Sequence, residues 1–248
     1  MEAIIKQLIP YGMLGIKTSF EDEGQDFRKI IKLRFLTAKN NLKLVIKIGG
    51  CEAKTDIILS ESLSCDEIIA PMVESKYSVK KFKKCDTHLT KGINLETITA
   101  CNNIDDIIKE CDGINSFVIG RVDLVGSLDK DRGVINSKEI YNICFAIFTK
   151  LRKKYGNSIK IGMGGSINKN SLNFIKDLYD NGLLDYVETR FIIFDVKSLL
   201  ENYNKGIYAA NVFEVEWLGY QNKVDSKELF SRQQREKMIE KRIIEFRE

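Results

Sequence analysis

The chain has 248 residues, of which 44% are hydrophobic and 30% charged, a composition that excludes an intrinsically disordered protein. Lys and Arg exceed Asp and Glu by 39 − 35 = 4, and this small, evenly spread excess argues against nucleic acid as a partner. The single histidine, His88, excludes every metal motif that needs two histidines. The six cysteines never have CxxC spacing, so we expect free thiols in a reducing compartment.

The N-terminal segment lacks the basic region and the long apolar region of a signal peptide. No apolar run approaches the roughly 18 residues that a membrane helix requires. The sequence therefore predicts a cytoplasmic protein without a membrane partner.

Short runs rich in Ile and Val recur along the chain, as in parallel strands that are buried on both faces. The predicted strands are Met13–Lys17, Lys43–Ile48, Glu67–Met72, Ile93–Ile98, Ser116–Ile119, Ile159–Met163, Tyr186–Thr189 and, as the last, Val212–Leu218. Amphipathic stretches alternate with these runs, and we expect helices over Gln25–Asn40, Ser137–Tyr155 and Ser171–Tyr179. Another helix is expected around Ile104–Ile108, with Asn102 as its cap.

The βα alternation favours an α/β fold with a parallel sheet. Seven or eight such units within about 220 residues fit a TIM-type (β/α)8 barrel better than an open doubly wound sheet. An open sheet would also need a GxGxxG turn near the N-terminus, which the sequence lacks. We therefore expect a barrel domain over residues 1–222 and an additional C-terminal amphipathic helix over residues 223–248.

In such a barrel the active site lies at the carboxyl ends of the strands. The polar residues and glycines expected there are Lys17, Glu21, Asp22, Glu23, Lys47, Gly49, Gly50, Glu74, Glu96, Gly120, Arg121, Asp123, Gly164, Gly165, Ser166, Glu188 and Arg190. Carboxylates at neighbouring strand ends can hold Mg²⁺ or Mn²⁺, hard ions that prefer oxygen ligands. Lysine and arginine on the same rim would bind an acidic substrate.

Five segments in register resemble the HpcH/HpaI aldolase/citrate lyase β-subunit family. They are Ser19–Asp22, Val45–Gly50, Ile69–Ser75, Asn94–Thr97 with Asn103–Ile107, and Phe117–Leu128. The most specific match is Glu96 followed by the GxxDL motif that contains Gly120 and Asp123. The resemblance covers roughly residues 13 to 195.

This resemblance implies a (β/α)8 barrel that uses Mg²⁺ or Mn²⁺, held by Glu96 and Asp123. The implied function is a metal-dependent carbon–carbon lyase or aldolase. Its substrate would be a small 2-oxo acid, of the pyruvate or oxaloacetate type, or its aldol adduct, and the reaction would pass through a metal-stabilised enolate. Glu74 lies in a similar segment, but it belongs to the preceding strand, so we expect it not to bind the metal.

The remaining site residues follow from these motifs and from the positions of polar residues at the predicted strand ends. Lys47 stands where the family usually has arginine, and we expect it to be catalytic together with Arg121. A Schiff base on Lys47 is an alternative that the sequence leaves open. The predicted substrate contacts are Lys17, Glu21, Asp22, Gly49, Gly120 and Arg190. The histidine that the aldolase branch carries after the first strand is missing, which leaves the general acid and base unidentified.

Two other functions remain open. The missing histidine is compatible with a catalytically silent barrel that acts as a binding or assembly subunit. The glycine-rich segment Gly164–Ser166 could instead hold the phosphate of an acid such as phosphoenolpyruvate.

The charged tail over Asp225–Glu248 carries apolar residues at mostly helical spacing, including Phe230, Met238, Ile239 and Ile243. This helix either packs on its own barrel or forms a subunit contact. We expect the contact, in a homo-oligomer for which the family resemblance implies a trimer or a hexamer.

Overall fold

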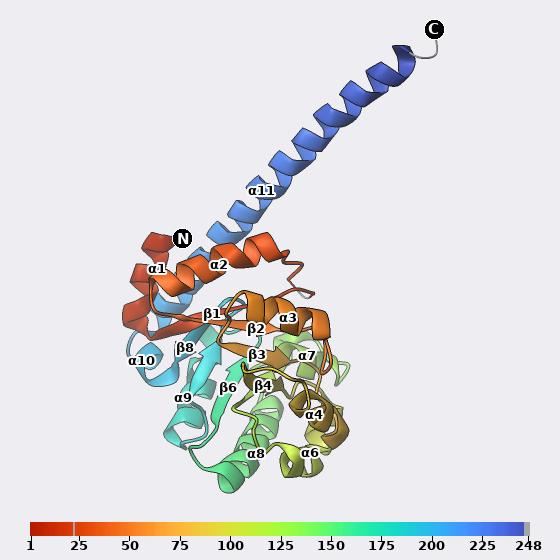
Figure 1. Cartoon of the computed structure of the whole chain (residues 1–248). Coiled ribbons are helices and arrows are strands. Elements are labelled where there is room, and N and C mark those ends of the chain that lie inside the picture. Colours follow the sequence, from red (N-terminus) through yellow and green to blue (C-terminus); the bar gives the residue numbers. More distant parts are fainter. Residues whose placement is uncertain (22, 246–248) are drawn as a thin grey trace.

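The computed structural model describes residues 1–21 and 23–245, with side chains described up to residue 227 and at 229, 230, 233 and 234. Eight strands form a closed barrel in the order in which they occur in the chain (Figure 1). They are β1 (Met13–Ser19), β2 (Lys43–Lys47), β3 (Glu67–Ala70), β4 (Thr90–Asn94), β5 (Ser116–Gly120), β6 (Lys160–Gly164), β7 (Tyr186–Glu188) and β8 (Ile192–Asp195). The predicted TIM-type α/β barrel is therefore confirmed.

The last strand runs against the others. Strands β1 to β7 pair in parallel, whereas β8 pairs antiparallel with both β7 and β1. A three-residue turn, residues 189–191, joins β7 to β8, because an antiparallel pair needs no crossover helix. The barrel thus closes through a hairpin rather than through an eighth parallel strand.

Strand alternation sorts the side chains inside the barrel into layers. An apolar layer contains Val45, Ile69, Val118, Tyr186 and Ile193. Because side chains two residues apart lie on one face of a strand, Lys47 lies above Val45, Gly120 above Val118, and Glu188 above Tyr186. The layer at the carboxyl ends is therefore polar and sits on an apolar floor.

Helices surround the barrel and cover the outer faces of its strands (Figure 1). The α-helices are α1 (Glu2–Leu8), α2 (Phe27–Lys39), α3 (Lys54–Ser62), α4 (Lys76–Lys83), α5 (Ile98–Asn102), α6 (Ile104–Glu110), α7 (Arg121–Gly126), α8 (Lys138–Tyr155), α9 (Leu172–Asp180), α10 (Val196–Glu201) and α11 (Tyr203–Glu245). Short 3-10 helices are η1 (Ile9–Tyr11), η2 (Arg132–Val134) and η3 (Lys169–Ser171). None of the described helices combines the length and apolarity that crossing a membrane requires.

Helix α11 packs on the barrel with its first half and then projects away from it (Figure 1). Ile207, Phe213 and Trp217 are buried, and the buried face ends at Gln221. Its 43 residues span about 65 Å at 1.5 Å per residue. Leu229 and Phe230 are exposed, while the side chains of Met238, Ile239 and Ile243 lie outside the described residues.

Three sequence predictions differ from the structure. The segment Val212–Leu218 is helical, within α11, and the eighth strand is Ile192–Asp195. The fourth strand begins at Thr90 rather than Ile93 and ends at Asn94. Asn102 is the last residue of α5 rather than a cap, whereas Thr97 caps that helix by accepting a hydrogen bond from the backbone N–H of Ala100.

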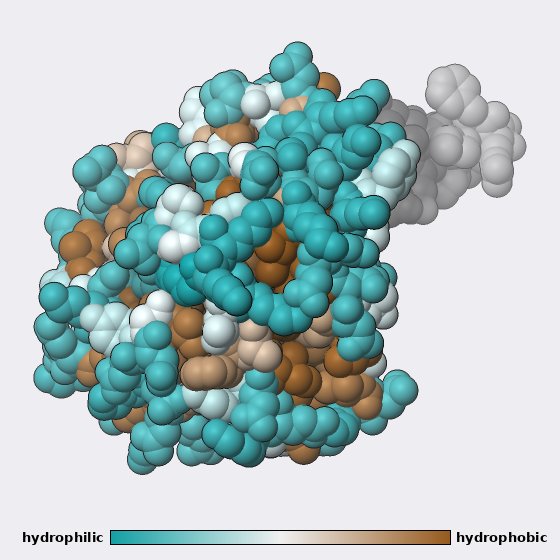
Figure 2. All heavy atoms as spheres, turned by 90° about the horizontal axis from the view of Figure 1, so that it is seen from below, coloured by the Kyte–Doolittle hydropathy of each residue, from teal (hydrophilic) through white to brown (hydrophobic). Residues whose placement is uncertain are grey.

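The exterior carries apolar side chains in separate places. Figure 2 shows one face on which hydrophilic side chains predominate and surround patches of hydrophobic ones. Ordinary globular surfaces expose apolar residues in this scattered way.

Candidate active site

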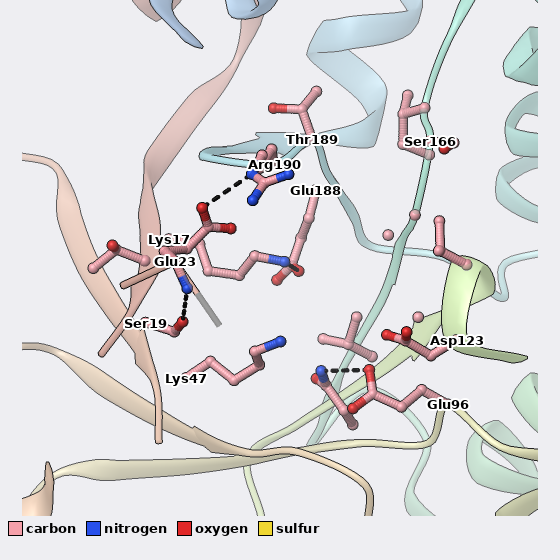
Figure 3. Close-up of a pocket in the computed structure, with 18 of the residues that line it drawn as sticks. Lys17, Ser19, Glu23, Lys47, Glu96, Asp123, Ser166, Glu188, Thr189 and Arg190 are labelled. Carbon is pink, nitrogen blue, oxygen red and sulfur yellow. Dashed lines mark hydrogen bonds and ion pairs between the residues drawn. The ribbon is translucent and has the colours of Figure 1, made fainter. Parts of the chain in front are cut away.

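A cavity of about 410 Å³ opens at the carboxyl ends of the strands. Its lining side chains come from β1, β2, β4, β5, β6 and β7, from the loops that follow them, and from α11. Figure 3 shows most of these residues. Because the layer below is apolar, this polar cavity is the place where the barrel can bind a charged ligand.

Glu96 and Asp123 lie next to each other on one side of the cavity (Figure 3). Glu96 follows β4 and is only 2% exposed, and its two carboxylate oxygens accept hydrogen bonds of 2.9 Å from the backbone N–H of Met72 and from Asn94 Nδ2. Burial raises the pKa of Glu96, and the negative charge of Asp123 raises it further, although the Met72 N–H and Lys47 oppose the shift. Asp123, on α7, is exposed, so a fixed, buried carboxylate stands beside a second one that is open to the cavity, an arrangement that favours a bound cation.

Gly120 leaves room for the Glu96 carboxylate. A Cβ atom at this position would lie 2.5 Å from Glu96 Oε2. The backbone of Gly120 has φ −84°, which any residue can adopt, so space rather than conformation requires glycine here. The predicted site residue Gly120 thus lines the cavity and permits the position of Glu96.

Lys47 reaches into the cavity from the end of β2, towards the two carboxylates (Figure 3). Alternation places it one layer above the buried Val45, so its ammonium faces the cavity rather than the outer helices. Its attraction for Glu96 is one of the effects that act on that carboxyl group. This position suits a contact with an anionic substrate group.

Lys17 and Glu188 form an ion pair in the same cavity. Lys17 Nζ lies 2.5 Å from Glu188 Oε2, and the side chains are 22% and 2% exposed. Burial alone would lower the pKa of Lys17, but the carboxylates of Glu188 and, to a smaller extent, Glu96 and Glu23 together outweigh it, and the pKa is raised. Lys17 is therefore an ammonium ion in the neutral pH range.

The cavity mouth combines the predicted substrate contact Arg190 with residues to which the sequence assigned no role. Arg190 donates a 3.0 Å hydrogen bond to Glu23, and Glu214 lies in the same part of the cavity, on α11. Burial raises the pKa of Glu214, with Arg190 opposing the shift. Arg132 and Asn211 also line the cavity. Only the tertiary fold brings Arg132, Asn211 and Glu214 to this place, so no local sequence signal could have found them.

Arg121 does not lie in the cavity, contrary to its predicted catalytic role. Its side chain is fully buried behind the wall, where the guanidinium donates to the carbonyls of Gly164 (3.2 Å) and Gly165 (2.9 Å) and to Asn136 Oδ1 (2.8 Å). It also stacks over Phe174 at 4.9 Å. Arg121 therefore ties the β5 and β6 ends together and cannot contact a substrate.

Two further predicted substrate contacts also lie outside the cavity lining. Glu21 is exposed, and Gly49 donates its N–H to Asp56 Oδ2 at 2.7 Å, which anchors the loop after β2 to α3. Asp22 lies outside the described residues. Glu74 does not line the cavity either, and it accepts a 2.6 Å hydrogen bond from the Thr97 hydroxyl.

Among the described residues, no group of three or more Asp, Glu, His or Cys side chains could hold a metal. A site with two carboxylates suits Mg²⁺ or Mn²⁺, which retain water or substrate oxygens as their other ligands. His88 is 78% exposed beside Glu61 and does not line the cavity.

Comparison with protein-family models and with curated proteins gives no match. The solved structures that resemble this chain include the citrate synthase SbnG, with 13% identity and a TM-score of 0.64 over 91% of each chain. A HpcH/HpaI aldolase/citrate lyase family protein from Burkholderia cenocepacia J2315 has 12% identity and a TM-score of 0.59, over 76% of this chain and 83% of that one.

The protein CitE from Mycobacterium tuberculosis, solved in complex with magnesium and pyruvate, is 14% identical. It superposes with a TM-score of 0.53 over 75% of this chain and 79% of its own. The resemblance read from the sequence motifs is thus confirmed by the fold. The chain shares the barrel fold of the HpcH/HpaI aldolases and citrate lyase β subunits.

Proposed function

We propose that this protein is a metal-dependent carbon–carbon lyase or aldolase acting on a small 2-oxo acid, of the pyruvate or oxaloacetate type, or on its aldol adduct. The observation that carries the proposal is the pair formed by Glu96 and Asp123 beside Lys47 at the mouth of the barrel. The structural neighbour CitE, solved in complex with magnesium and pyruvate, supports the same class.

The residues present fit a divalent cation. Glu96 is buried and held by two hydrogen bonds, and the missing side chain at Gly120 leaves space around its carboxylate. Glu96 and Asp123 would hold Mg²⁺ or Mn²⁺, since both offer oxygen ligands. When bound, such an ion polarises the carbonyl of a 2-oxo acid and stabilises the enolate that carbon–carbon cleavage produces.

The protein's own groups would position the substrate. Lys47 would bind the carboxylate of the acid as a point charge, in place of a bidentate arginine. Asn94 orients Glu96 through its hydrogen bond, and the apolar floor around Val118 and Tyr186 limits the depth to which a small acid can enter. Of the predicted substrate contacts, Lys17, Gly120 and Arg190 line the cavity, Lys17 as the ion-pair partner of Glu188.

The geometry gives less support to the two alternatives. A catalytically silent barrel would have no need to keep the buried carboxylate of Glu96 beside the charge of Asp123, which repels it. A phosphate site at Gly164–Ser166 is less favoured because two carbonyls of this segment point to Arg121, so its backbone does not present amide groups alone.

The test is metal-dependent exchange of the methyl protons of pyruvate. Protein stripped with a chelator should exchange these protons in D₂O only after Mg²⁺ or Mn²⁺ is added, and it should cleave oxaloacetate or an aldol adduct under the same conditions. Exchange that is independent of metal would contradict the proposal, and trapping of a pyruvate adduct on Lys47 by borohydride would replace it with an imine mechanism.

We also propose that residues 223–248 form a contact between subunits of a homo-oligomer. Leu229 and Phe230 are 56% and 61% exposed on the part of α11 that leaves the barrel. Light scattering of the full chain tests this, because a monomer at high micromolar concentration would contradict it.

A further inference from the structure

The ion pair between Lys17 and Glu188 faces Glu96 and Asp123 across the cavity (Figure 3). The fold fixes both partners. Strand β8 pairs with β7, which ends at Glu188, and with β1, and the backbone N–H of Lys17 donates to the Phe191 carbonyl at 2.7 Å. The hairpin therefore holds the pair in place before any substrate arrives.

The proposed reaction needs a base, because carbon–carbon chemistry on a 2-oxo acid moves a proton at C3 or at a hydroxyl group. The described residues that line the cavity include no histidine, cysteine or tyrosine. With Glu96 and Asp123 assigned to the metal, the carboxylates left in the cavity are Glu23, Glu188 and Glu214.

Glu188 is the best placed of these three. It stands in the polar layer inside the barrel and is 2% exposed, whereas Glu23 is paired with Arg190 at the mouth and Glu214 lies on α11. Among the described side chains, only Lys17 donates a hydrogen bond to Glu188, and it uses Oε2. The second oxygen, Oε1, is available to a ligand in the cavity.

We infer that Glu188 is the catalytic base of this site and that Lys17 is its positioning residue. This inference rests on the proposed function. Glu188 takes a proton from C3 of the bound 2-oxo acid, and the electrons of the C3–H bond become the C2–C3 double bond of the enolate. When the enzyme forms a carbon–carbon bond, C3 of the enolate attacks the carbonyl carbon of an aldehyde and the C2 carbonyl re-forms. The aldehyde oxygen then takes the proton from Glu188.

Lys17 would act through Glu188 rather than on the substrate. Its ammonium pairs with a carboxylate that is almost excluded from water, and so holds that carboxylate in its orientation. The raised pKa of Lys17 agrees with this arrangement, because Glu188 makes the largest of the favourable contributions that together outweigh burial. Arginine should replace lysine in this role, whereas methionine, of similar length, should not.

The experiment compares exchange of the pyruvate methyl protons in D₂O, with Mg²⁺, for the full chain and its variants. Glu188→Gln should slow the exchange at least about 100-fold, the usual contribution of a general base. Binding of Mn²⁺ and of pyruvate should stay within about threefold of the unchanged protein, since neither uses Glu188. Glu74→Gln, a change outside the cavity, is the matched control and should exchange at the original rate.

A measurement on the metal-free protein tests the pair independently of turnover. The ¹³C signal of the Lys17 ε-carbon, followed by NMR as pH is raised, should titrate at lower pH in Glu188→Gln, because the partner charge is gone and burial remains. Lys17→Met should slow exchange at least about tenfold more than Lys17→Arg does. Equal rates in these two variants would overturn the positioning role.

The outcomes separate this inference from the proposed function. Exchange at the full rate in Glu188→Gln would overturn the inference and leave the proposed function standing. Loss of Mn²⁺ or pyruvate binding in that variant would also overturn it, in favour of a structural role. No exchange by the unchanged protein with any metal would overturn both. If Glu188→Gln does not fold, Glu188→Asp keeps the charge but withdraws the oxygen, and a full rate in that variant overturns the base assignment.

Discussion

The two sides of the cavity are built differently. On the side of β2 to β5, Lys47, Asn94, Glu96, Gly120 and Asp123 follow parallel strands in a regular βα order. On the other side the cavity wall combines the β7–β8 hairpin, the end of β1 and residues of α11. The first side contains the proposed metal and carboxylate contacts, and the second contains the proposed base.

This difference shows which parts of a site local sequence can reveal. The residues of the first side lie at or just after the ends of β2, β4 and β5, so a short motif contains both the strand and the functional group. On the second side, Lys17 and Glu188 are 171 positions apart and meet only because the barrel closes. Variants on the two sides of the cavity test how far the sides differ in function.

The largest effect should come from the carboxylates of the first side. Glu96→Gln and Asp123→Asn should each abolish Mn²⁺ binding and lower kcat by at least about 1000-fold, because the ion loses one of its two protein ligands. Titration with Mn²⁺ measures the first effect and a steady-state assay the second. Glu74→Gln should retain the metal, and the opposite pattern would place the site on β3.

The second largest effect should come from replacing Lys47. Lys47→Ala should lower kcat/KM about 100-fold, because the substrate carboxylate loses a charged partner in the cavity. Lys47→Arg should retain activity, since its guanidinium offers the same charge with two parallel hydrogen bonds. An unchanged kcat/KM in Lys47→Ala would show that Lys47 does not bind the substrate carboxylate.

A matched pair of glycines compares the two sides directly. Gly120→Ala would place a Cβ 2.5 Å from Glu96 Oε2, whereas Gly164→Ala would place one at an ordinary 3.6 Å from Glu188 Oε2. Metal affinity should fall about tenfold in the first variant, because a ligand must move, and should stay unchanged in the second. Calorimetric titration with Mn²⁺ measures the affinity of each variant. Equal losses of affinity in the two variants would show that the close approach of Gly120 to Glu96 has no special role in metal binding.

The smallest effect should follow removal of the outer part of α11. A chain ending at Asn222 keeps the buried Trp217 and loses the ion pair of Lys29 with the exposed Asp225. The free energy of unfolding should therefore fall by less than about 1 kcal/mol, as measured by denaturant titration. Light scattering should show a particle smaller than the loss of the tail alone explains. A large loss of stability would show that the barrel itself needs residues 223–248.

Much of the fold could be predicted because parallel strands leave a strong local signal. Runs such as Leu44–Ile46 and Phe117–Ile119 are entirely apolar, mostly β-branched, and buried on both faces. The eighth strand could not be found by the same pattern, because no helix separates Ile192–Asp195 from β7. A βα order assumed throughout therefore moved the last strand to Val212–Leu218.

The site residues, like the strands, could be predicted where a local motif contains them. Glu96, Asp123, Lys47 and Gly120 all line the cavity, as the motifs indicated. Arg121 was misplaced, because it begins α7, one residue after the strand, and its side chain turns behind the wall. A side chain just after a strand can point into the cavity or behind its wall. For Arg121, only the packing of β6 against β5 decides between the two.

The hairpin between β7 and β8 also bears on how this barrel can change over evolutionary time. Barrel enzymes diversify mainly by lengthening the loops that follow their strands. Here a turn of three residues stands where a seventh such loop would lie, and its Thr189 and Arg190 already line the cavity. Insertions at this turn would disturb strand pairing on both of its flanks. New specificities on this side would therefore arise by substitution on α11, at Asn211 and Glu214, rather than by growth of a loop.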